Sequence, residues 1–144
     1  MGQKAENSNL ASEFYIMSLL YTMGLSPILT LGNKKEIDIL IHTKNKTYTI
    51  DVKGIKDKSN WPVGTKAKIE SIKELKNHIF IFVSFLNKLN DPNVRPEIFV
   101  VPSEDVINLK VSWGEKHDQY SIMYNALKKE AVKYENAWHY LTND

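Results

Sequence analysis

Hydrophobic residues recur at two different spacings along this chain, and these spacings separate the expected helices from the expected strands. Between Ser8 and Met23 they return every three or four residues, which predicts a helix capped by Ser8 or Asn9 and stopped by Gly24. Glu13 falls inside the apolar arc of this helix, where a carboxylate costs free energy unless it reaches water at the edge or is compensated. The arc itself consists of Leu10, Phe14, Met17, Leu20 and Tyr21.

Shorter apolar runs bounded by turn residues predict five strands: one in 26–31, two in the hairpin 36–53, one in 78–85 and one in 97–101. The stretch 54–64 is expected to be irregular, 66–76 a short helix, and 86–96 a loop. Ser103 is expected to cap a helix with an acidic first turn, and a further helix is expected around 124–134. This order predicts an α/β fold in which a central mixed β-sheet of about five strands is flanked by helices.

The composition narrows the class of protein. The 144 residues, 42% of them hydrophobic and 25% charged, are expected to form one domain spanning 1–144. No apolar run reaches the roughly 20 residues of a membrane span, and the polar N-terminus does not resemble a signal peptide. The absence of cysteine excludes disulfides, thiol catalysis and cysteine-ligated zinc, and it favours a cytoplasmic location. The four histidines have no spacing typical of a zinc site.

The hairpin 36–53 carries acids and a lysine in otherwise good strands. If Lys44 and Asn45 form the loop, Asp38 lies opposite Asp51; if the loop is one residue later, Asp38 faces Lys53 instead. Both loops put the polar side chains on one face and the apolar ones on the other, whereas a three-residue loop would flip one strand. The polar set is Glu36, Asp38, Thr49, Asp51 and Lys53.

This polar face has two interpretations, a solvated outer face or a metal site. Opposed aspartates repel each other across a sheet, and a divalent cation would remove that repulsion. Mg²⁺ binds to a few carboxylates, keeps several waters, and promotes hydrolysis of phosphodiesters. Lys53 could orient or deprotonate the attacking water, and the carbonyl of Val52 could be a further ligand. The pattern therefore predicts metal-dependent phosphodiester hydrolysis.

Asp38, twelve intervening residues and then Asp51-Val52-Lys53, with an acid-bearing helix upstream, resemble the PD-(D/E)XK nuclease superfamily. Ile37 stands where the name of the superfamily has proline. The resemblance implies a restriction-endonuclease-like core, metal binding by both aspartates, catalysis by the lysine, and Mg²⁺ or Mn²⁺ as cofactor. It assigns Glu13 to the acidic position of the first helix, and Glu36 to an auxiliary ligand or an ion-pair partner of the lysine.

The likeness extends to a group of small, poorly characterised bacterial proteins in that superfamily, through IDVKGIKDKSNWPVG, RPEIFVVPSEDV and AWHYL. One element departs from the superfamily pattern. A Gln-x-x-x-Tyr motif on a second core helix is absent between Lys53 and His78, so the substrate side of the site is expected to differ.

The net charge of +2 is small, but the stretch from Lys53 to Lys76 contains seven lysines and only three acids. This stretch is either a solvated face or a contact for a polyanion. Trp61 could stack on a base or pack in a loop. The candidate nucleic-acid contacts are Lys56, Lys58, Lys66 and Lys68.

These features lead to an expected function. The sequence predicts a metal-dependent endonuclease acting on nucleic acid, with DNA as the expected substrate and no membrane partner. The alternative is a catalytically inactive module of the same fold that binds nucleic acid or protein. A homodimer that completes the substrate cleft stays open.

Overall fold

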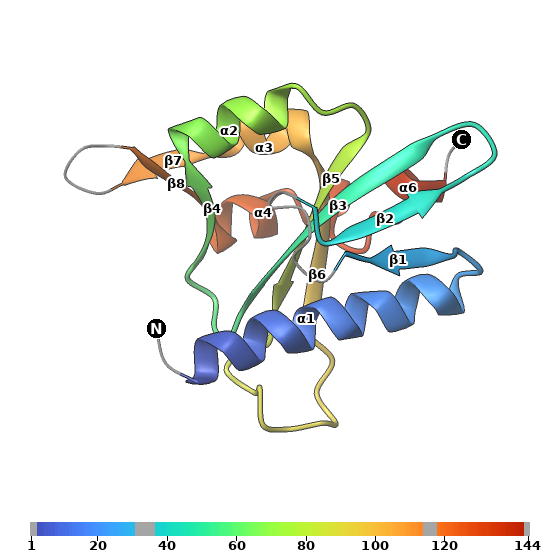
Figure 1. Ribbon diagram of the computed structural model, residues 1–144. Coiled ribbons are helices and arrows are strands. Elements are labelled where there is room, and N and C mark those ends of the chain that lie inside the picture. Colours follow the sequence, from blue (N-terminus) through green and yellow to red (C-terminus); the bar gives the residue numbers. More distant parts are fainter. Residues whose placement is uncertain (1–2, 31–36, 114–117, 143–144) are drawn as a thin grey trace.

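A five-stranded sheet forms the centre of the computed structural model, which describes residues 3–30, 37–113 and 118–142 (Figure 1). Its spatial order is β1-β2-β3-β5-β6. Strands β3 and β5 run parallel and the other neighbours antiparallel, so the predicted mixed sheet is confirmed. The strands are β1 (Pro27–Leu29), β2 (Ile39–His42), β3 (Thr47–Ile55), β5 (His78–Ser84) and β6 (Glu97–Pro102).

A second, smaller sheet has the order β4-β8-β7 and was not predicted. Its strands are β4 (Asn60–Thr65), β7 (Val111–Trp113) and β8 (Gln119–Met123). Strand β4 occupies the stretch expected to be irregular, and its ladder with β8 shifts register between Pro62 and Gly64. Trp61 in β4 is 0% exposed and donates its indole N–H to the carbonyl oxygen of Val83 at 3.0 Å. Trp61 therefore packs in the core and is not available to stack on a base.

Six helices are present among the described residues: α1 (Gln3–Thr22), α2 (Lys66–Lys73), α3 (Ser103–Leu109), α4 (Tyr124–Lys129), α5 (Ala131–Tyr134) and α6 (His139–Thr142). Helix α1 starts five residues before the expected cap at Ser8, and Gly24, with φ +82°, follows its end as predicted. Ser103 is not a cap: Pro102 holds the N-cap position of α3 and makes no side-chain cap hydrogen bond. In the described part of the chain, no helix is long and apolar enough to cross a membrane.

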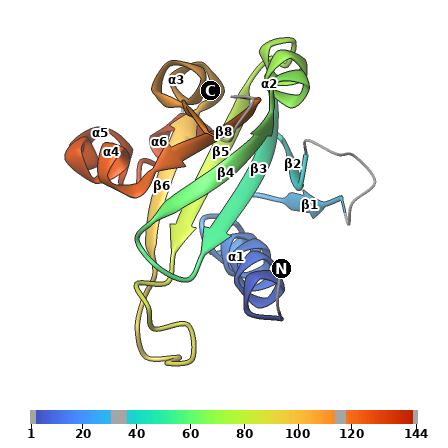
Figure 2. The same ribbon diagram turned by 90° about the vertical axis from the view of Figure 1, so that its left-hand side faces the viewer.

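The central sheet is covered on both faces, with α1 on one and α2, α3 and the smaller sheet on the other (Figure 1 and Figure 2). Strand β5 shows why its sequence is continuously apolar. Ile79, Ile81 and Val83 pack toward α1, whereas Phe80 and Phe82 pack toward the smaller sheet. A strand buried on both faces needs apolar side chains at successive positions.

The apolar arc expected on α1 faces the core only in part. Leu20 is buried and Met17 packs against the core, whereas Leu10, Phe14 and Tyr21 are 53%, 59% and 60% exposed. Besides Leu20, the buried side of α1 carries Ser8, Ser12 and Ile16, because small side chains are needed where the helix lies close to β3.

Candidate active site

The register of the hairpin brings the two aspartates together. Ile39 pairs with Ile50 and His42 with Thr47, so the loop is Lys44-Asn45. The paired residues end at Ile39, and Asp38, which comes directly before it, is hydrogen-bonded to Ile50 and Val52 on either side of Asp51. The backbone N–H of Thr43 donates to the carbonyl of Lys46 at 2.8 Å and closes this loop. The first of the two expected registers is the correct one.

Asp38 is fixed by backbone hydrogen bonds at the end of β2. Its own N–H donates to the carbonyl of Ile50 at 2.8 Å, and its carbonyl accepts from the N–H of Thr30 at 2.9 Å. Its Oδ2 accepts from the N–H of Val52 at 2.7 Å. The carboxylate is thus held against the Asp51-Val52 segment of β3.

Asp51 is 2% exposed and lies between two lysines. The Nζ of Lys53 is 3.1 Å from Oδ1 of Asp51, and the Nζ of Lys68, from α2, is 3.3 Å from Oδ2. The second contact is an ion pair without hydrogen-bond geometry, so the buried Oδ2 has no hydrogen-bond donor among the described residues. Gly64 in β4 permits this approach, since a Cβ there would lie 2.6 Å from Cδ of Lys68.

Helix α1 brings Glu13 to the edge of this group. A Cβ on Gly54, next to Lys53, would lie 1.7 Å from Oγ of Ser12 and 2.6 Å from the carbonyl oxygen of Ser8. The helix and β3 are therefore packed as closely as a glycine allows. Glu13 follows Ser12 on the flank of α1, half-buried, and its charge acts on Asp38.

Burial and mutual repulsion set the charges of the site. Burial, then the charges of Asp51 and Glu13, raise the pKa of Asp38 to about 7, against the opposing effects of the Val52 N–H and Lys53. Burial alone would lower the pKa of Lys53. The charges of Asp51 and Asp38 and a side-chain contact between Lys53 and Lys68 outweigh burial, so the pKa is raised. Burial, together with the charge of Lys53, lowers the pKa of Lys68 despite Asp51. Lys53 is therefore the more firmly cationic of the two lysines.

The remaining predicted site residues do not join this group. Lys56, Lys58 and Lys66 are exposed on the β3–β4 connection and at the start of α2. Glu36 lies outside the described residues. Lys68 was expected only as a contact for nucleic acid, and the structure places it on Asp51. Only a weak sequence signal points to Lys68. Lys68 and Ile72 have the four-residue spacing of the Gln-x-x-x-Tyr motif, but neither residue is of the type that the motif requires.

Sequence reasoning did not select His78, which is 2% exposed at the start of β5. Its Nδ1 and the Oγ1 of Thr49 are hydrogen-bonded at 2.7 Å, and its Nε2 has no hydrogen-bond partner among the described residues. Burial lowers its pKa to about 4, with Lys68 and Lys53 adding to the shift and Asp51 opposing it. His78 is therefore a neutral imidazole at pH 7, on the face of the sheet that carries Asp51.

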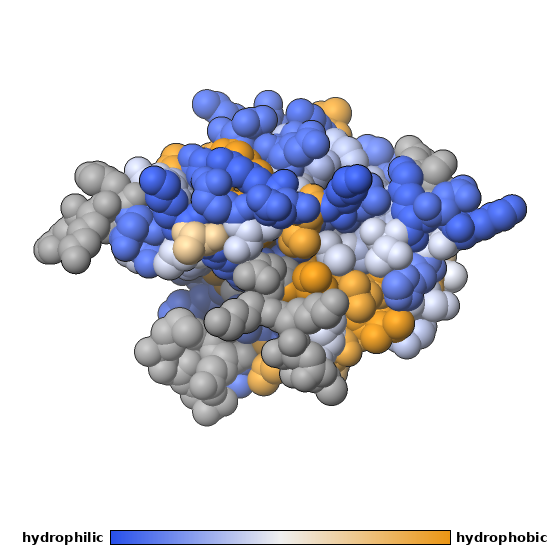
Figure 3. Space-filling model, turned by 45° about the horizontal axis from the view of Figure 1, so that its top comes forward, coloured by the Kyte–Doolittle hydropathy of each residue, from blue (hydrophilic) through white to orange (hydrophobic). Residues whose placement is uncertain are grey.

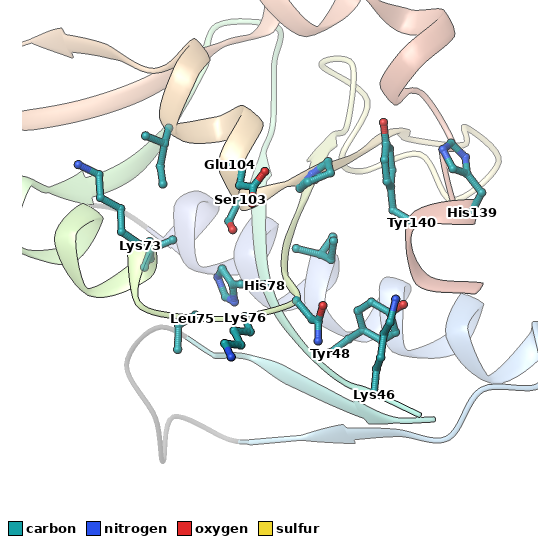
Figure 4. A pocket seen from close by; sticks show the side chains of 15 residues that line it. Lys46, Tyr48, Lys73, Leu75, Lys76, His78, Ser103, Glu104, His139 and Tyr140 are labelled. Atoms are coloured by element: carbon teal, nitrogen blue, oxygen red, sulfur yellow. The ribbon is translucent and has the colours of Figure 1, made fainter. Parts of the chain in front are cut away.

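A cavity of about 860 Å³ is lined by His78 but not by Asp51 (Figure 4). Thr49, paired with His78, precedes Asp51 by two residues, which is about 7 Å along a strand. The cavity is formed by the ends of α2 and β6 and by α3 and α6, and its lining is rich in basic side chains. These are Lys46, Lys73 and Lys76, against one acid, Glu104.

The candidate ligand atoms are of the type that a small divalent cation prefers, but they are too few to complete its coordination. The carboxylates of Asp38 and Asp51 supply oxygen, the donor atom that Mg²⁺ prefers, and the buried Oδ2 of Asp51 lacks a hydrogen-bond donor. Among the described residues, no three histidine, aspartate or glutamate side chains group closely enough to hold an ion. Waters and backbone oxygens would have to complete the coordination, as is usual for Mg²⁺.

The mixed five-stranded sheet with helices on both faces is a restriction-endonuclease-like fold, and solved structures show the same fold. One is Hjc, a Holliday junction resolvase from Archaeoglobus fulgidus, with a TM-score of 0.51 and 12% identity over 84% of this chain and 88% of the resolvase. Another is the bacterial homing endonuclease I-Ssp6803I, with a TM-score of 0.54 and 14% identity over 96% of this chain and 92% of the endonuclease. No protein-family model and no curated protein matches the sequence.

Proposed function

We propose that this protein is a metal-dependent endonuclease that hydrolyses phosphodiester bonds of DNA. The observation that carries the proposal is a buried carboxylate, Asp51, in contact with Lys53 and next to a second carboxylate, Asp38, whose Oδ2 accepts from the N–H of Val52. The two similar structures are a Holliday junction resolvase and a homing endonuclease, which supports DNA as the substrate. A cysteine-free chain acting on DNA suits the cytoplasm.

Mg²⁺, or Mn²⁺ in its place, would bind to Asp38, Asp51 and the carbonyl of Val52, with Glu13 contributing from α1. The ion would supply an activated water and offset the charge that develops on the phosphate. In the metal-free protein, Asp51, Lys68 and Asp38 raise the pKa of Lys53, which favours its protonated form. Its role is therefore to donate hydrogen bonds to the water or to a phosphate oxygen, rather than to remove a proton.

The substrate would approach from the side of α2 and α3. Figure 3 shows hydrophilic residues gathered over this side of the molecule. Lys66 is exposed at the start of α2, and the basic cavity beside His78 continues this surface. Lys56 and Lys58 are exposed on the β3–β4 connection, at the other end of these strands beside the loop after β5, and would contact more distant phosphates. Lysine contacts to phosphates provide affinity without sequence specificity.

The test is cleavage of plasmid and of single-stranded DNA with Mg²⁺ or Mn²⁺, by the wild type and by Asp51→Ala and Lys53→Ala. Each variant should lose about 10²-fold or more of the rate, the usual cost of removing one group that stabilises the transition state. Glu74→Ala, an exposed acid on the same side, is the matched control and should cleave normally. Cleavage that persists in both site variants would come from a contaminant and would refute the enzyme.

A second candidate function is a binding module of the same fold that does not cut. The observation in its favour is that Lys53 and Lys68 together already neutralise Asp51 without an ion. The two candidate functions predict different effects of a metal ion on the melting temperature of the protein. An active site should gain stability from Mn²⁺ and lose that gain in Asp51→Ala. A binding module should show salt-sensitive DNA binding and neither cleavage nor this gain.

A further inference from the structure

The outer face of α1 is apolar although it faces solvent. Leu10, Phe14 and Tyr21 are more than half exposed, and Met17 lies between them at the border of the core. Between residues 7 and 22 the helix carries a single charged side chain, Glu13, on its flank. A surface helix of a monomer normally places charged and polar residues outward, and a helix that is apolar on both sides is covered on both sides.

The spacing of these four residues indicates which partner packs on the outer face of α1. Positions 10, 14, 17 and 21 are separated by four, three and four residues, so the pattern is the same in both chain directions. An antiparallel second copy of α1 would place Leu10 against Tyr21 and Phe14 against Met17, twice over. A two-fold interface requires such self-complementarity, and alternating three- and four-residue spacing is that of helix–helix seams.

We propose that the protein forms a homodimer through antiparallel packing of the outer faces of α1. Phe14 and Tyr21 each contribute roughly 100 Å² of exposed apolar surface, given that an aromatic side chain buries 150–250 Å² in full. Together with Leu10, the patch reaches the few hundred Å² at which exposed apolar surface is usually functional.

The area also sets the strength of the dimer. A stable interface buries about 800 Å² on each partner, and the α1 patch lies below that value. The homodimer should therefore dissociate on dilution.

The interface leaves both candidate sites open. Helix α1 covers one face of the central sheet, and α2 lies on the other (Figure 2). The Asp51 side chain lies on the face of α2, where it contacts Lys68. Each copy of the dimer would therefore expose its site on the side away from the two-fold axis. Dimer formation is measured without substrate, so its test gives an answer whether or not the protein cleaves DNA.

The first test is sedimentation equilibrium over concentrations on the order of 1–100 μM, the range in which an interface of this size should associate. The wild type should rise from the 16.6 kDa of one chain toward twice that mass. Phe14→Glu should stay monomeric throughout, because it buries a charge at the centre of the seam. Val132→Glu, at a fully exposed apolar residue of α5, is the matched control and should dimerise as the wild type does.

A second test locates the contact. The chain has no cysteine, so Met17→Cys introduces a single thiol close to the expected two-fold axis. A short bismaleimide should link two copies of this variant and should not link Val132→Cys. A wild type that remains monomeric at the highest concentration would overturn the proposal. A dimer unaffected by Phe14→Glu, or linked equally well in both cysteine variants, would also overturn it.

Discussion

At Asp51 the two oxygens of one carboxylate are contacted by two different lysines, and a bound cation would have to share that carboxylate with them. Lys53 is adjacent along β3, whereas Lys68 comes from α2 and contacts the oxygen that lacks a hydrogen-bond donor. Burial and the charge of Lys53 lower the pKa of Lys68, so it is the lysine whose charge is less favourable in the site. Lys68 and a divalent ion would therefore compete for Oδ2 of Asp51.

Substitution of Lys68 should separate metal binding from catalysis. Lys68→Met keeps most of the aliphatic stem and removes the competing charge, so Mn²⁺ should raise the melting temperature more than in the wild type. Cleavage should fall by about tenfold or more, because a donor near the phosphate is lost. Lys66→Met, two residues earlier and exposed, should change neither quantity. Weaker Mn²⁺ binding in Lys68→Met would contradict the competition.

Asp38 should make the metal-free protein less stable as the pH rises. Its pKa is about 7 in the folded chain against 3.8 for an unperturbed carboxyl, so the folded state holds the proton more tightly than the unfolded state. The contribution of this group is complete below about pH 4 and is lost as the pH rises toward 7. In chelator, Asp38→Asn should flatten this part of the melting-temperature profile relative to the wild type. An unchanged profile would show that Asp38 has an ordinary pKa.

At the scale of the elements, the contact between α1 and β3 positions Glu13 beside the aspartates. Gly54→Ala would bring a methyl group within 2.6 Å of the Ser8 carbonyl oxygen, a backbone atom that cannot rotate away. The helix must shift, which should cost about 1–3 kcal/mol in unfolding free energy. Cleavage should also fall because Glu13 moves.

The clash in Gly54→Ala can be partly relieved. Ser12→Gly in the same chain removes the closest contact, Oγ at 1.7 Å, and leaves the backbone contact with Ser8. The double variant should therefore recover some but not all of the lost stability, measured by urea denaturation. Full stability of Gly54→Ala alone would mean that the helix is not packed against β3 as closely as the structure places it.

How far the sequence predicts these elements depends on whether their partners are local. The β2–β3 hairpin was predictable because a two-residue loop and strand alternation together determine which side chains share the face of Asp51. Strand β4 was missed because Pro62 and Gly64 interrupt its pattern and its partner β8 lies far along the chain. The core side of α1 was predicted only in part, because Ser8 and Ser12 face a glycine, which hydrophobicity does not indicate. Lys68 reaches Asp51 only through tertiary packing of α2.

At the scale of the whole molecule, positive charge continues from the candidate site into the cavity beside His78. Lys46 and Lys76 line this cavity from the β2–β3 turn and from the segment after α2 (Figure 4). A strand whose scissile phosphate lies at Asp51 would extend along β3 toward these side chains. They should therefore contact phosphates next to the cleaved one.

This placement predicts a salt-dependent loss of binding in the cavity variants. Lys46→Gln and Lys76→Gln should each weaken DNA binding about equally for different sequences, and each should reduce the slope of log K against log salt by about one. Fluorescence anisotropy in chelator measures this without cleavage. Lys129→Gln, an exposed lysine of α4 outside the cavity, is the matched control and should leave the slope unchanged. If all three variants lower the slope equally, net charge alone governs binding and the cavity is not part of the DNA path.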